Sequence, residues 1–171
     1  MTSGANGDPV TIIMIEDDEG HARLIERNIR RAGVNNEIVG FSDGSSALAY
    51  LMGPDGTGVS NAKRAILVLL DLNLPVQDGW DLFEKLTSNN PLLPVIVITA
   101  RPNQVFPALA SGVGALMEKP LDLPKLLNII RQLLEEPVEA QLARMTGRPA
   151  EFHYLPHRPE DKTRSIHNKG R

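Results

Sequence analysis

Five residues with chemically useful side chains follow short apolar runs in this sequence. Glu16 and Asp17 follow the run 10–15, and Asp71 follows 65–70. Thr99 follows 94–98, and Lys119 follows 115–117. If each run is a parallel strand, the strand ends meet at one edge of the sheet, where open α/β sheets bind ligands. No one of these residues is diagnostic alone, so their shared location carries the interpretation.

These residue types suit one kind of chemistry when they lie together. Two carboxylates about 4 Å apart repel by on the order of 4 kcal/mol at an effective dielectric near 20, so a crowded group protonates, separates or binds a cation. Hard oxygen ligands favour Mg²⁺, which often completes its shell with water and phosphate. An aspartate can attack phosphorus, and a lysine and a metal ion neutralise the phosphoryl charge. The set therefore predicts a phosphoryl-transfer site.

Alternating strand-like and helical patterns predict the scaffold that positions these residues. The apolar runs 10–15, 36–41, 65–70, 94–98 and 115–117 alternate with helical stripes at 22–32, 45–52, 78–86, 107–111 and 122–135. The stripe at 107–111 is the weakest. Such alternation is typical of a doubly wound α/β fold with a parallel sheet and right-handed crossovers.

Length and composition limit the other options. The chain has 171 residues, a formal net charge of −3 and no cysteine, so we expect one cytoplasmic domain without disulfide or thiolate chemistry. No signal peptide is visible and no apolar run is long enough to span a bilayer. We expect a flexible segment over 1–9, a domain over 10–136 and a polar, irregular or disordered tail over 137–171. The negative net charge argues against direct DNA binding, and so does the absence of a helix-turn-helix pattern in the tail.

Four segments give the sequence a specific resemblance. IIMIEDDE, LLDLNLPVQDGW, VIVITA and MEKPLD occur in this order, and with them the chain resembles the receiver domains of two-component response regulators, in the CheY-like superfamily. The resemblance covers 10–136 and implies a flavodoxin-like fold. It implies a five-stranded parallel sheet of order 2-1-3-4-5 with helices on both faces. With no effector domain apparent, we expect a stand-alone receiver.

The resemblance also implies a metal site. Glu16 and Asp17 match the family's pair of metal-binding acids, and Asp71 matches its phosphoacceptor. The backbone carbonyl of Asn73 would be the remaining protein ligand of Mg²⁺. Asp17 and Asp18 are the alternative acid pair, although an apolar strand that ends just before residue 16 favours Glu16 and Asp17.

Further residues match the part of the family's site that meets the phosphoryl group. Thr99 matches the hydroxyl that swings toward the phosphate, and the backbone amide of Ala100 would help to hold it. Lys119 matches the cationic residue. Pro120 matches a cis-proline of the family, a feature that fixes a tight turn.

The chain departs from the family's pattern on the output side. Many receivers have a rotating aromatic residue where this sequence has Leu116. Pro102 and Pro107 restrict the fourth helix, and the loop 53–64 is longer than usual. Arg101 lies where family members tune the lifetime of the phosphoryl group. We therefore expect an atypical output surface.

The leading hypothesis is a phosphoacceptor rather than an enzyme, with at most self-catalysed phosphotransfer and dephosphorylation. It receives its phosphoryl group from a sensor histidine kinase or a phosphotransfer protein and signals by protein–protein contacts with an unknown target, with homodimer formation as one route. The alternative is a pseudo-receiver, an interaction module that does not depend on phosphorylation. A haloacid-dehalogenase-like phosphohydrolase is disfavoured, because such enzymes carry a second aspartate where this chain has Asn73.

Overall fold

The computed structural model describes residues 10–53, 66–75, 77–147 and 152–157. The strands are β1 (Thr11–Ile15), β2 (Ile38–Phe41), β3 (Ile66–Asp71), β4 (Val95–Thr99), β5 (Ala115–Glu118) and β6 (His153–Leu155). The helices are α1 (Glu19–Arg31), α2 (Gly44–Met52), α3 (Gly79–Asn89), α4 (Val105–Ser111), α5 (Leu123–Glu135) and α6 (Val138–Met145). The expected flexible segment 1–9, most of the loop 53–64 and the tail beyond 157 lie outside the described residues.

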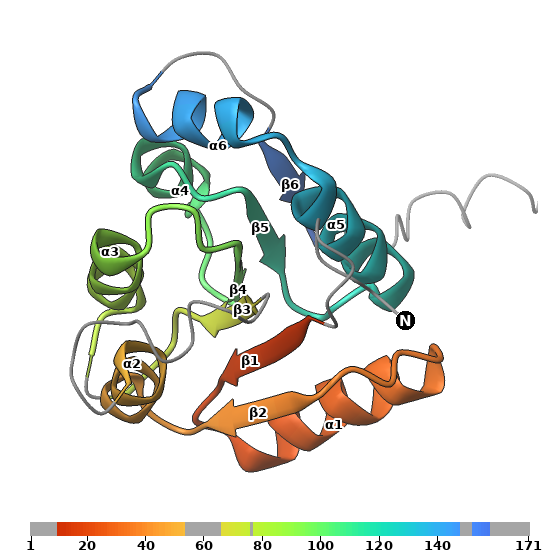
Figure 1. Cartoon of the computed structure of the whole chain (residues 1–171). Coiled ribbons are helices and arrows are strands. Elements are labelled where there is room, and N and C mark those ends of the chain that lie inside the picture. The colour runs from red at the N-terminus through yellow and green to blue at the C-terminus, as the bar shows by residue number, and fades with distance from the viewer. Residues whose placement is uncertain (1–9, 54–65, 76, 148–151, 158–171) are drawn as a thin grey trace, which may run out of the picture.

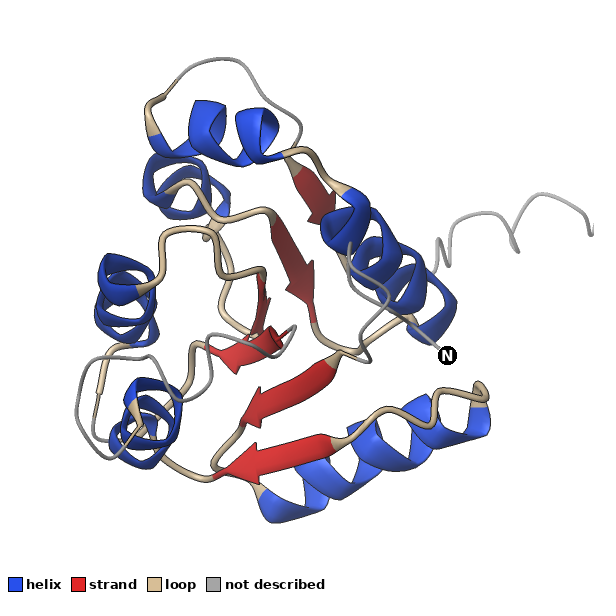
Figure 2. Cartoon of the chain, in the orientation of Figure 1, coloured by secondary structure: helices blue, strands red, loops and turns tan. Residues whose placement is uncertain are grey.

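The strands form one sheet of order β2-β1-β3-β4-β5-β6 (Figure 1). Every neighbouring pair is parallel, which confirms the predicted doubly wound fold and its order through the fifth strand. Figure 2 shows α1 and α5 on one side of the sheet and α2, α3 and α4 on the other. Among the described residues, no helix is both long and apolar enough to cross a membrane.

Two layers of core explain why the central strands carry apolar residues on both faces. Along β1, Ile13 and Ile15 pack in the cluster that includes α2, α3 and α4, whereas Ile12 and Met14 pack in the cluster that includes α1 and α5. Successive side chains of a strand point to opposite faces, so a strand covered on both sides needs apolar residues at every position. This burial holds the carboxyl ends of β1, β3 and β4 in fixed positions.

The expectation of an irregular tail from residue 137 is wrong for part of the segment. Residues 138–145 form α6, and β6 adds a sixth strand parallel to β5. Arg144 of α6 makes an ion pair with Glu136, and both side chains are only 10% exposed. Phe152 and Leu155 pack against the two core clusters. These elements depend on long-range contacts rather than on a local periodic pattern, and so the sequence pattern did not predict them.

Candidate functional site

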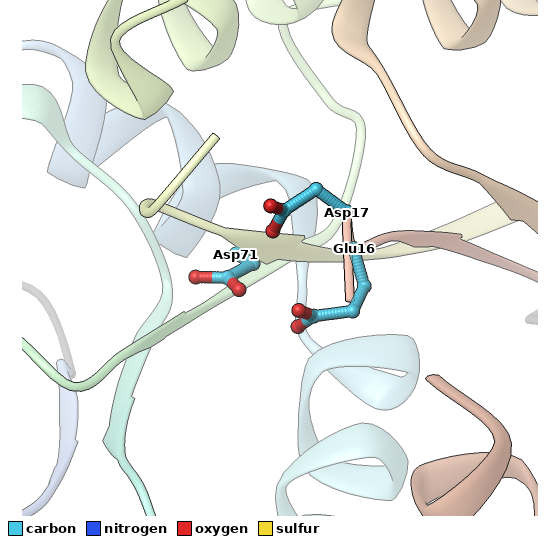
Figure 3. Close-up of side chains that lie close together, drawn as sticks. All are labelled: Glu16, Asp17 and Asp71. Carbon is cyan, nitrogen blue, oxygen red and sulfur yellow. The ribbon is translucent and has the colours of Figure 1, made fainter. Parts of the chain in front are cut away.

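Three acids from two adjacent strand ends lie together at the carboxyl edge of the sheet. Asp71 is the last residue of β3, and Glu16 and Asp17 directly follow β1, which pairs with β3. One ligand oxygen from each of the three carboxylates lies within 4.8 Å of the others, and Figure 3 shows the carboxylates facing one another. Asp71 and Glu16 are buried, with 2% and 5% exposure. The donor set is that of a hard divalent cation.

Lys119 brings a positive charge to this group from the end of β5. Its Nζ lies 2.9 Å from Oδ2 of Asp71 and 3.4 Å from Oε2 of Glu16. The Lys119 amide donates to the carbonyl of Thr99 at 2.8 Å, which ties the end of β5 to the end of β4. The peptide bond from Lys119 to Pro120 is cis, as predicted.

The surroundings of Glu16 and Asp71 shift the pKa values of the two acids in opposite directions. Burial, together with the hydrogen bond to Asp71, raises the pKa of Glu16 above its usual range. Burial also acts to raise the pKa of Asp71, but hydrogen bonds from Glu16, the Asn73 amide and Lys119 outweigh it and hold that pKa below its usual range. This network therefore favours the ionised form of Asp71, which is the form that acts as a nucleophile.

The loops after β3 and β4 meet beside Asp71. The Asn73 amide donates to Oδ1 of Asp71 at 2.9 Å, and the Asn73 side-chain oxygen accepts from Nε of Arg101 at 2.6 Å. The Arg101 amide in turn donates to the hydroxyl of Thr99 at 2.9 Å. Thr99 is fully buried and the next residue, Ala100, is exposed. The roles of the Asn73 carbonyl and the Ala100 amide stay predictions.

The structure places Asp18 in a different role from the two acids before it. Asp18 caps α1, because its side chain accepts from the His21 amide. The grouping with Asp71 thus involves Glu16 and Asp17, the pair that the strand boundary favoured.

Sequence reasoning missed two residues near the site. Nδ1 of His21 lies 2.9 Å from Oε2 of Glu16; a histidine five positions after the acid, at the start of a helix, was the available signal. Tyr154 pairs in register with the buried Leu116, and its hydroxyl donates to Glu118 at 2.6 Å. No local pattern connects Tyr154 to residues so distant in sequence.

The fold and the acid cluster define a receiver-type phosphoacceptor module, and comparison with known proteins identifies the family. The family model of the response regulator receiver domain matches residues 12–131. The chain belongs to this family, and so it is a phosphoacceptor signalling module of two-component systems.

Three relatives illustrate the similarity. A receiver domain crystal structure from Rhodospirillum rubrum is 49% identical with a TM-score of 0.61, and the match covers 72% of this chain and 90% of that one. FilR2, a probable methanogenesis regulatory protein of Methanothrix harundinacea, is 33% identical, with 75% of this chain and 83% of FilR2 covered. Response regulator Rcp1 of Synechocystis is 28% identical, and the match covers 75% of this chain and 89% of Rcp1.

A divalent metal ion fits the acid cluster. The crystal structure of the Mn²⁺-bound form of Rcp1 is 27% identical to this chain, with a TM-score of 0.58 and coverage of 76% of this chain and 98% of that one. In the chain described here, oxygen atoms of Glu16, Asp17 and Asp71 converge with no competing soft ligand in the group. Carboxylate oxygens bind hard divalent ions such as Mg²⁺ and Mn²⁺.

Proposed function

We propose that Asp71 accepts a phosphoryl group from a phosphohistidine of a sensor histidine kinase or phosphotransfer protein, with Mg²⁺ as the cofactor. The observation that carries this proposal is the ionised Asp71 carboxylate held 2.9 Å from Nζ of Lys119, with two further acids alongside. A buried carboxylate kept anionic and flanked by a cation is prepared to attack phosphorus.

The transfer needs no further reactant. An Asp71 carboxylate oxygen attacks phosphorus and forms a P–O bond, while the P–N bond to the donor imidazole breaks. The electron pair stays on that nitrogen, and a proton on the other ring nitrogen makes the departing group a neutral imidazole. Glu16, Asp17, Asp71 and the backbone carbonyl of Asn73 would hold the Mg²⁺, which when bound supplies positive charge next to the phosphoryl oxygens.

Other residues of the site meet the transferred group. Lys119 moves its ammonium from the Asp71 carboxylate to a phosphoryl oxygen and so keeps its charge paired. The Thr99 hydroxyl, which accepts from the Arg101 amide, turns to donate to a second phosphoryl oxygen. The Ala100 amide donates to the same group. These donors stabilise negative charge as it develops during transfer.

The proposal also covers organisation and partners. The receiver domain occupies 10–136, and α6 and β6 extend it on the β5 side. Its output is protein–protein contact with a downstream protein or a second copy, without direct DNA binding. A cytoplasmic location fits a chain without cysteine.

The test is incubation of the full chain with Mg²⁺ and acetyl phosphate, and separately with a phosphorylated histidine kinase, followed by intact mass measurement. We expect one added phosphoryl group on the wild-type chain and on Asp81→Asn, which changes an exposed aspartate of α3. We expect none on Asp71→Asn. A phosphoryl group that persists on Asp71→Asn contradicts the assignment.

A pseudo-receiver is the second candidate function, and one observation favours it. Leu116 is fully buried where many receivers carry the aromatic residue that moves on phosphorylation. This alternative predicts that a captured partner binds the wild-type chain and Asp71→Asn equally, with or without acetyl phosphate. Partner binding that changes with phosphorylation contradicts it.

A further inference from the structure

The side chain of His21 contacts the acid cluster and has no role in the function proposed above. It lies in the first turn of α1, its side chain is 23% exposed, and its Nδ1 lies 2.9 Å from Oε2 of Glu16. A carboxylate oxygen accepts hydrogen bonds, so Nδ1 carries the proton and donates it. The imidazole therefore contacts the same Glu16 oxygen that lies 3.4 Å from Nζ of Lys119.

Glu16, Asp18 and His21 form a closed ring of hydrogen bonds. The Asp18 amide donates to Oε1 of Glu16 at 3.3 Å, the His21 amide donates to Oδ1 of Asp18 at 2.8 Å, and the His21 imidazole donates to Oε2 of Glu16. Gly20 lies beside this ring, and a Cβ there would lie 3.3 Å from Oδ1 of Asp18. Both oxygens of the Glu16 carboxylate therefore accept a hydrogen bond within the ring.

A glutamate at this position needs such support more than an aspartate does. Its side chain has one more rotatable bond than that of Asp17 or Asp71, and ordering each extra rotor costs entropy when a ligand binds. Side chains that hydrogen-bond to a metal ligand fix its orientation, and their loss typically weakens metal affinity about 10- to 100-fold. The ring makes His21 such a partner for Glu16.

We propose that His21 is a positioning residue for the metal site, where its imidazole holds the Glu16 carboxylate in the orientation that receives a divalent ion. This inference rests on the proposed function, since it assigns Glu16 to that ion. Helix capping does not explain the imidazole. The cap uses the His21 backbone amide, which any residue other than proline supplies.

The test compares Mg²⁺ affinity by isothermal titration for four forms of the full chain: wild type, His21→Ala, His21→Asn and His157→Ala. Asparagine places an N–H donor close to the position of Nδ1 and keeps the hydrogen bond. His157 is the matched control, because it is exposed and its bond to Glu118 comes from the backbone amide. The thermal unfolding of each metal-free variant reports whether the fold is intact.

We expect His21→Ala to raise the Mg²⁺ dissociation constant about tenfold or more, His21→Asn to restore most of the affinity, and His157→Ala to match the wild type. The phosphorylation rate of His21→Ala should recover at saturating Mg²⁺. Unchanged affinity in His21→Ala, or equal losses in His21→Ala and His21→Asn, overturns the positioning role alone. A wild-type chain that binds no Mg²⁺ overturns the proposed function itself, and this inference with it.

Discussion

Nζ of Lys119 lies 2.9 Å from Oδ2 of Asp71, in an ion pair that joins the ends of β5 and β3 across the intervening strand β4. Burial alone would lower the pKa of Lys119, but the hydrogen bond and charge of Asp71 outweigh it and raise that pKa. The lysine therefore remains a cation at physiological pH. Beside Asp71, it is placed to neutralise the negative charge of a phosphoryl oxygen bound there.

Replacing this lysine should slow phosphorylation more than it disturbs the fold. We expect Lys119→Met to reduce the rate of phosphorylation by acetyl phosphate about 100-fold, because one preorganised group that meets the transition-state charge is typically worth that much. The measurement is the time course of phosphoryl incorporation by intact mass at fixed Mg²⁺. Lys125→Met, which removes an exposed lysine paired with Asp122, should react at the wild-type rate, and a similar loss there would contradict the prediction.

The acid cluster should destabilise the metal-free protein. Oxygen atoms of Asp17, Glu16 and Asp71 lie within 4.8 Å of one another, so we expect Asp17→Asn to raise the free energy of unfolding by about 1 kcal/mol without metal. At 100 times the dissociation constant, Mg²⁺ should add about 2.7 kcal/mol to the wild type by linkage and much less to Asp17→Asn. Urea unfolding with and without Mg²⁺ measures both effects. A less stable metal-free Asp17→Asn would show that repulsion is not the dominant interaction.

Close packing explains why the segment DLNLPVQDG ends in a glycine, Gly79. A Cβ on Gly79 would lie 2.6 Å from the backbone Cα of Leu72, so Gly79→Ala forces α3 away from the end of β3 and should cost about 1–3 kcal/mol. Gly40 is the control, since nothing lies within 4 Å of its added Cβ. Urea unfolding of both variants tests this. Equal stabilities of Gly79→Ala and Gly40→Ala would mean that the helix moves without cost.

The attachment of β6 should weaken in alkaline solution. The hydrogen bond to Glu118 raises the pKa of Tyr154, because it favours the neutral phenol. For a group whose pKa is higher in the folded state, the stabilisation is complete below the unfolded pKa, near 10 for tyrosine, and is lost as the pH rises through the folded value. The phenolate absorbance of the wild type minus that of Tyr154→Phe gives the titration of this one residue. A midpoint at or below the ordinary tyrosine value would contradict the contact.

The sequence predicted the parts of the molecule that have strong local patterns. The apolar runs predicted the first five strands, and the family resemblance predicted their order in the sheet. Asp71, Thr99 and Lys119 were expected at one edge of the sheet because each follows such a run. Helix α4 begins at Val105, two residues before the predicted start at Pro107, because proline is tolerated in the first turn of a helix.

The remaining features depend on partners far along the chain. β6 has three residues, and Tyr154 finds Glu118 only when the strand is paired with β5. Its sequence neighbours, rich in proline and charge, resemble a solvated tail. His21 was missed for another reason: a single histidine on a helix carries no periodic signal, and its contact with Glu16 depends on side-chain geometry at the helix start.

The sixth strand changes how copies of this protein can associate. By pairing with β5, it occupies the backbone groups that an intermolecular strand would otherwise join. Among the described residues, the outer border of the sheet on that side is a strand of three residues, and very short edge strands limit pairing with a neighbour. We therefore expect an assembly built on this border to depend on side chains of β6 and its neighbouring helices more than on backbone pairing.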